Sequence, residues 1–518
     1  MFVNRFCFEK RYFCIEFRIF YHSHLCYNIH IENNWRLFMK QTDWKIIYTS
    51  YEGISKSAIH LLSKEAGALL IREPNVYRIY VLPCEKEGCD VSKNAFFVGR
   101  YGESAEIKKY VSESEVPSDG FLVKVIKNPE DEEGRFVILT AHTEQELFYS
   151  VVSFLDDYIP QYAPKHGENR MPDLIFDSPL REVSYTEIPD NKTRSIFTWG
   201  HSINDYRAYI DNMARLKFNE LIIWNDYIPL NIKDIIAYAH TYGIKVNLGY
   251  SWGWSTGCAK ITDISDQRLL ELKKDIISKY ENNYLGTGCD GIYFQSFTER
   301  KDEYIGGRLI AEGVTTLVNM VSAELLQKYP NLKLQFGLHA TSVTKRLDEI
   351  AKVDSRVEIL WEDCGEFPYH YRSFVTDEVQ YAETLEFTKK LLELRNGIGV
   401  GLVFKGVMML DWTKFIRQQG PYIMGENSKM IAAHDRHIRA KAWKEYTANW
   451  MRNGDRAAQM LRFIKDHKIG EVNMCLAGTF DGGIYLPMAL CAEMYRTCDG
   501  EYKDMLSRVA RRSSITVD

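Results

Sequence analysis

Long apolar runs are absent from this sequence of 518 residues, and no stretch reaches the roughly 18 residues that cross a bilayer. Charged side chains interrupt residues 9–18, where a signal peptide would need an uncharged apolar core. The sequence also lacks a sustained lysine and arginine stripe beyond its first few dozen residues, and its net charge is −5, which excludes the basic footprint of a nucleic-acid binder. These absences predict a cytoplasmic protein with no membrane or nucleic-acid partner, and they leave its oligomeric state open.

Metal-ligand spacings are absent as well. The eleven cysteines are scattered, without the spacing of a zinc site or the density of a disulfide scaffold, so most are expected to be reduced and buried. A metal-dependent barrel hydrolase would need two histidines at its first strand, and the first expected strand here offers only His201. We therefore predict neither a metal site nor a cofactor.

Aromatic residues, by contrast, are abundant: the chain has 32 Tyr, 26 Phe and 10 Trp, and 45% of its residues are hydrophobic. This composition can build a large core, and the length suits a barrel of about 250 residues with an accessory domain. Residues 1–38 differ from the rest, because they are crowded with Phe, Tyr, His, Asn and Cys and show no helical or strand periodicity. We expect a non-native or disordered leader there, with Met39 as the true start.

Two patterns of secondary structure follow the leader. Short strands and helices mixed over residues 39–160 predict an α/β accessory domain, and the polar, proline-containing residues 161–193 predict a linker. In the accessory domain we expect strands at 45–49, 76–82, 95–98, 121–126 and 135–139, and helices at 55–69 and 144–157.

Strict alternation of strands and helices begins near residue 194. Eight apolar runs predict buried parallel strands at 195–199, 220–224, 245–249, 291–295, 333–337, 357–361, 399–405 and 472–477. Amphipathic helices are expected between them at 206–216, 232–242, 266–280, 313–329 and 377–394. We therefore predict a (β/α)8 TIM barrel over 194–495, followed by a tail or truncated helical region at 496–518. An open doubly wound sheet is the alternative, but residues 199–202 are not its Gly-rich phosphate turn.

The residues that follow the eight apolar runs are rich in tryptophan and carboxylates. In such a barrel the active site lies at the C-terminal ends of the strands, and a sugar pocket combines aromatic platforms with polar groups. Because tryptophan also covers barrel ends in proteins that bind no sugar, a barrel that binds carbohydrate without turnover is the alternative to an enzyme. We predict that the carbohydrate contacts are Trp199, His201, Trp224, Asn225, Asp226, Tyr250, Trp252, Trp254, Gln295, His339, Trp361, Lys405, Asp411 and Trp412.

Cleavage of a glycosidic bond needs two carboxyl groups, one protonated to donate to the leaving oxygen and one ionised as base or nucleophile. Glu299, shortly beyond the fourth strand, is our candidate acid. The second carboxyl is predicted among Glu362, Asp363 and Glu366. We favour Asp363 because adjacent residues of an extended segment point opposite ways. The alternative for this cluster is a solvated acidic loop or a salt bridge to Lys405.

Several segments carry a resemblance to known glycosidases. Residues 96–100 (FFVGR), 119–121 (DGF) and 138–155 lie in the accessory domain, and residues 290–299 (DGIYFQSFTE) follow in the barrel. In this order the chain resembles the α-glucuronidases of glycoside hydrolase family 67. It resembles more loosely the family 20 β-hexosaminidases, which also place an α/β domain before the barrel.

The resemblance implies a glycosidase whose glycan contains a uronic acid or an amino sugar, with Glu299 as its acid. Family 20 enzymes carry an adjacent Asp-Glu pair after strand four, whereas here Thr298 precedes Glu299. The α-glucuronidases add a helical domain after the barrel, whereas this sequence ends soon after Cys498. These departures leave open which sugar is bound, and whether configuration inverts, with carboxyls about 6.5–9.5 Å apart, or is retained, at about 5–5.5 Å.

Overall fold

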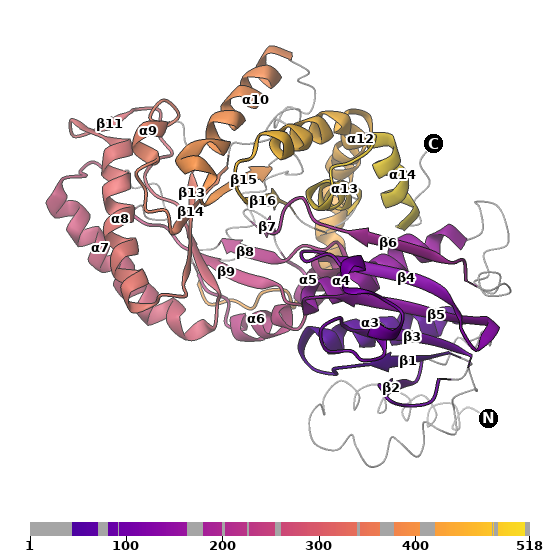
Figure 1. The fold of residues 1–518 in the computed structure, drawn as a ribbon. Coiled ribbons are helices and arrows are strands. Elements are labelled where there is room, and N and C mark those ends of the chain that lie inside the picture. Colours follow the sequence, from indigo (N-terminus) through magenta and orange to yellow (C-terminus); the bar gives the residue numbers. More distant parts are fainter. Residues whose placement is uncertain are drawn as a thin grey trace, which may run out of the picture.

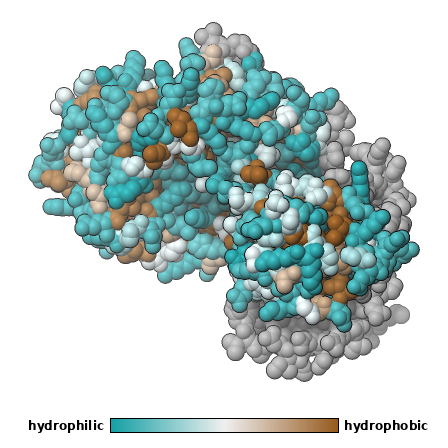
Figure 2. All heavy atoms as spheres, in the orientation of Figure 1, coloured by the Kyte–Doolittle hydropathy of each residue, from teal (hydrophilic) through white to brown (hydrophobic). Residues whose placement is uncertain are grey.

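The computed structural model describes residues 44–70, 81–91, 93–162, 180–198, 203–224, 227–253, 261–338, 342–362, 378–404, 420–478, 480 and 485–512. These residues form a six-stranded sheet with its helices and, beside it, a closed barrel (Figure 1). One large apolar cluster includes residues of both parts. The face drawn in Figure 2 is mostly hydrophilic, with apolar side chains in scattered patches. Among the described residues, no helix is long and apolar enough to cross a membrane.

The first sheet has the strand order β2-β1-β3-β5-β4-β6. Strands β1, β2, β3 and β5 pair in parallel, whereas β4 pairs antiparallel with both β5 and β6. The strands are β1 (Trp44–Tyr48), β2 (Cys84–Lys86), β3 (Asn94–Arg100), β4 (Phe121–Asn128), β5 (Asp131–Ala141) and β6 (Val183–Glu187).

The central strand β3 is buried on both faces, which its sequence of apolar residues requires. Phe96 belongs to the same cluster as helices α3 (Gly53–Leu70) and α4 (Glu144–Ser153), whereas Phe97 belongs to a second cluster on the opposite face. Side chains alternate between faces along a strand, so adjacent phenylalanines anchor both sides of the sheet. Thr143 caps α4 by accepting a hydrogen bond from the Glu146 amide.

The structure corrects the linker that was predicted at 161–193. Strand β6 lies inside that range and forms the edge of the first sheet, with Val125 paired to Val183 and Phe121 to Glu187. Its alternating, half-exposed residues resemble a polar segment because one face of an edge strand meets solvent. Most of the strand predicted at 76–82 lies outside the described residues, and the short β2 was not predicted.

The barrel closes in the order β7-β8-β9-β10-β13-β14-β15-β16, and each neighbouring pair is parallel. The predicted (β/α)8 barrel is therefore confirmed. The bounds of β8, β9, β14 and β16 agree with the predicted ranges, and the other four differ by one or two residues at one or both ends. The strands are β7 (Arg194–Phe197), β8 (Glu220–Trp224), β9 (Lys245–Gly249), β10 (Gly291–Phe294), β13 (Lys333–Leu338), β14 (Val357–Trp361), β15 (Val400–Phe404) and β16 (Val472–Ala477).

Helices surround the barrel on its outer side (Figure 1). The barrel's five predicted helices are present, and the described residues form the further helices α9, α12, α13 and α14. Ser428 caps the long α12, and α14 lies within the predicted tail at 496–518. The helices are α5 (Tyr206–Arg215), α6 (Ile232–His240), α7 (Asp266–Lys279), α8 (Ile310–Lys328), α9 (Leu347–Ile350), α10 (Glu378–Leu392), α12 (Lys429–His467), α13 (Tyr485–Arg496) and α14 (Tyr502–Arg512).

Candidate active site

Seven of the eight barrel strands are followed by residues outside the described part of the chain, and only the segment after β10 is described without a gap. The predicted roles of the side chains in those seven segments stay predictions. They are Trp199, His201, Asn225, Asp226, Trp254, His339, Asp363, Glu366, Lys405, Asp411 and Trp412.

The segment after β10 presents Glu299 to solvent. Ser296 and Thr298 are buried, whereas Glu299 is exposed. The Ser296 hydroxyl donates to the Trp252 carbonyl at 2.7 Å, and the Ser342 hydroxyl donates to the Thr298 carbonyl at 2.5 Å. Neighbouring segments thus fix the backbone that leads to Glu299, while its carboxyl stays accessible to a substrate.

Glu362, the first residue after β14, lies inside the barrel with 0% of its surface exposed. Its Oε1 accepts hydrogen bonds from the Tyr293 hydroxyl and from Nε2 of Gln295, and the same Nε2 lies 3.2 Å from the Tyr293 hydroxyl. Tyr293 lies in β10, and Gln295 is the residue directly after this strand. We call these three side chains the clamp, because they tie the end of β14 to the end of β10.

Tyr293 reaches Glu362 by crossing over β13, which lies between β10 and β14. A Cβ at Gly337 would stand 1.8 Å from the Tyr293 hydroxyl, so only glycine leaves room for the ring there. Phe197 and Trp224 pack against the ring at centroid distances of 4.9 and 5.5 Å. Burial, followed by the charge and hydrogen bond of Glu362, raises the pKa of Tyr293 well above its ordinary value. The phenol therefore keeps its proton and donates a hydrogen bond to Oε1 of Glu362.

Three of the predicted carbohydrate contacts face away from the barrel interior. Trp252 stacks on Phe294 at 3.5 Å, and the Tyr250 hydroxyl donates to a carbonyl of α7 at 3.1 Å. Trp361 packs on Phe387 of α10 at 5.0 Å. All three are almost fully buried in the layer between barrel and helices. The structure places them in this packing and not on the mouth surface where they were predicted.

Trp224 and Gln295, two further predicted contacts, do face the interior. Trp224 belongs to the apolar cluster inside the barrel, and Gln295 is part of the clamp. Sequence reasoning missed Tyr293, which has the same strand parity as Gln295 and therefore points to the same face. Strand parity alone could have found Tyr293. The need for glycine at position 337, in contrast, depends on how neighbouring strands are staggered.

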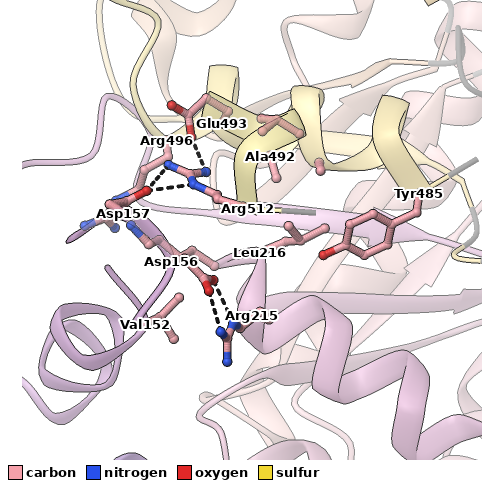
Figure 3. A pocket seen from close by; sticks show the side chains of 13 residues that line it. Val152, Asp156, Asp157, Arg215, Leu216, Tyr485, Ala492, Glu493, Arg496 and Arg512 are labelled. Carbon is pink, nitrogen blue, oxygen red and sulfur yellow. Dashed lines mark hydrogen bonds and ion pairs between the residues drawn. The ribbon is translucent and has the colours of Figure 1, made fainter. Parts of the chain in front are cut away.

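A cavity of about 100 Å³ lies outside the candidate active site, between the six-stranded sheet with its helices and helices α13 and α14 (Figure 3). Arg215 pairs with Asp156, and Arg512 pairs with both Asp157 and Glu493. The other charged side chains around it are paired as well. The cavity thus belongs to the ionic contact between sheet and barrel and contains none of the predicted site residues. Nor is any group of three His, Cys, Asp or Glu in the described ranges arranged to hold a metal ion.

Comparison with known proteins shows a similar fold but assigns the chain to no sequence family. No protein-family model matches the chain, and no curated protein matches it. Among solved structures, the chain is similar to BtGH115A, a family GH115 4-O-methyl-α-glucuronidase with specificity for decorated arabinogalactans. The two share 14% identity over 91% of this chain and 59% of that one, with a TM-score of 0.51.

Two other similar structures are also glycoside hydrolases. A family 89 enzyme from Clostridium perfringens shares 8% identity over 90% of this chain and 51% of its own, with a TM-score of 0.49. CpGH84D shares 14% identity over 70% of this chain and 57% of its own, with a TM-score of 0.45. The chain thus spans between half and three fifths of the length of these structures. At such identities the likeness concerns the barrel fold, and membership of family 67 or 20 stays a prediction.

Proposed function

We propose that the chain is a glycoside hydrolase that binds its sugar at the C-terminal mouth of the barrel. One observation supports this most: exposed Glu299 follows β10, and the clamp ties β10 to the start of the carboxylate-rich segment after β14. This arrangement brings acidic groups from two strands toward one end of the barrel, as paired-carboxylate hydrolysis requires. The fold likeness to glycoside hydrolases agrees with the proposal.

In this proposal Glu299 protonates the leaving oxygen, and a carboxylate of the segment 362–366 activates water or attacks the sugar. Glu362 is fully buried, which suits a supporting role better than contact with substrate. Asp363 and Glu366 are therefore the stronger candidates for the second reacting carboxyl. A uronic acid or an amino sugar is the proposed substrate class, on the resemblance of residues 290–299.

The test is hydrolysis of a panel of aryl glycosides and uronides by the full chain and by Glu299→Gln. We expect the variant to lose at least about a hundredfold in kcat/KM, the usual size of an acid–base contribution. Asp302→Asn is the matched control, because Asp302 is an exposed carboxylate three residues further along the same segment, and it should retain full activity. If the wild type cleaves nothing while it binds sugars, the chain is a carbohydrate-binding protein and the proposal fails.

A further inference from the structure

The clamp joins the two strands that carry the proposed reacting groups. Gln295 precedes Glu299 by four residues on the segment after β10, and Glu362 directly precedes Asp363 on the segment after β14. The amide of Glu362 also donates to the carbonyl of Leu338 at 3.1 Å, so its backbone is fixed to β13 as well. The start of each carboxyl-bearing segment is therefore held by the same group of side chains.

We infer that Tyr293, Gln295 and Glu362 are positioning residues that fix the distance between the ends of β10 and β14, from which the segments with the proposed reacting carboxyls start. The inference rests on the proposed function and deepens it. The separation of the two carboxyls decides the chemistry, since inverting and retaining glycosidases differ by about 1–4.5 Å in this distance. A displacement of about 1 Å in a catalytic group can cost on the order of a hundredfold in rate.

The cost of the clamp argues that it does more than fill space. A buried carboxylate is expensive to desolvate, and an apolar side chain of similar volume would pack the interior without that cost. The rest of the interior cluster is in fact mostly apolar, with Phe197, Ile222 and Leu360 among its members. The clamp also requires a glycine on the intervening strand, at Gly337. Polar side chains placed here at such cost indicate a directional role.

Among the described residues, Tyr293 on β10 and Cys475 on β16 interact electrostatically with Glu362. Burial and then the charges of nearby glutamates raise the pKa of Cys475 well above its ordinary value, so this thiol stays neutral. Both neighbours thus keep their protons over the ordinary pH range. A substitution at Tyr293 consequently removes a hydrogen-bond donor without changing the charge of the interior.

The experiment is a double-mutant cycle on kcat and KM, with the panel substrate that the wild type cleaves fastest. The variants are Tyr293→Phe, Glu362→Gln and the double variant. We expect Tyr293→Phe to lower kcat by about tenfold or more while KM changes by less than about threefold. Because the two residues act as one unit, the double variant should be about as slow as the slower single variant.

Tyr158→Phe is the matched control. Tyr158 lies in the first part of the chain, is equally buried, and donates to the carbonyl of Arg181 at 2.7 Å. It should lose similar thermal stability, a few degrees in Tm, without loss of kcat. The inference is overturned if Tyr293→Phe keeps wild-type kcat, or if its effect and that of Glu362→Gln multiply. A wild type that cleaves nothing would instead remove the proposed function, and the inference with it.

Discussion

The two ends of the barrel interior hold buried glutamates in different ways. At the N-terminal end, Glu220 of β8 lies 2.7 Å from the ammonium of Lys333 and also accepts from Nε2 of Gln335 at 2.7 Å. At the C-terminal end, Glu362 accepts from the uncharged side chains of Tyr293 and Gln295. The first arrangement contains a charge-neutralising cation, whereas the donors to Oε1 of Glu362 among the described residues include a phenol and an amide.

The N-terminal arrangement extends around the barrel. Lys333 also lies 3.3 Å from Glu358, and Asn473 bonds both glutamates at 3.0 Å. The hydroxyl of Ser195 donates to Glu220 at 2.8 Å. Strands β7, β8, β13, β14 and β16 are thus joined by one polar network.

Burial, the largest single effect, raises the pKa of Glu220, but the charge of Lys333 and the hydrogen bonds from Lys333, Gln335 and Ser195 outweigh it and lower the pKa overall. In barrels of this type the N-terminal end serves stability and the C-terminal end serves chemistry. The comparison suggests that the same division holds within the interior of this barrel. The cation-paired glutamate would hold the strands together, and the clamp would hold the reacting groups in place.

Removing the cation gives the largest expected loss of stability. In Lys333→Met, Glu220 would remain buried without its ammonium partner. Because the Lys333 side chain is 30% exposed, we expect a cost of up to about 3 kcal/mol, the lower end for a fully buried pair. We expect the midpoint of urea unfolding to fall accordingly, while kcat per folded molecule is unchanged. Lys352→Met is the control, because Lys352 forms an exposed pair with Glu349, and loss of an exposed pair should leave the unfolding midpoint almost unchanged. Equal losses in the two variants would contradict the account.

A smaller effect is expected in the pH dependence of unfolding. Since the folded pKa of Glu220 is lowered, its contribution to stability is present above about pH 4.3, the unfolded value. That contribution is lost as the pH falls through the folded pKa. Between about pH 4.3 and 3, the wild type should lose up to about 1.4 kcal/mol per pH unit more than Glu220→Gln. Parallel stability curves, measured by denaturant unfolding at each pH, would show that Glu220 contributes nothing.

How far the sequence could predict this molecule depends on the element. The barrel strands were predicted closely, because runs such as 220–224 and 357–361 are buried on both faces and apolar throughout. Strand β6 was missed because it has only five residues, two of them exposed and none fully buried, so its sequence resembles a polar linker. Gln295 and Glu362 were predicted as site residues, but their mutual contact and the role of Gly337 were not. Both depend on the relative stagger of neighbouring strands, which the sequence of one strand does not determine.

The most direct test of the division between the two ends is to measure kcat and the free energy of unfolding on the same samples of Glu362→Gln and Lys333→Met. The account predicts opposite effects in the two variants, with kcat lowered in one and the free energy of unfolding lowered in the other. Glu362→Gln should lose about tenfold or more in kcat with a stability loss of about 1 kcal/mol, whereas Lys333→Met should lose stability and keep kcat. A Glu362→Gln variant with wild-type turnover, or a Lys333→Met variant that is stable but inactive, would contradict it.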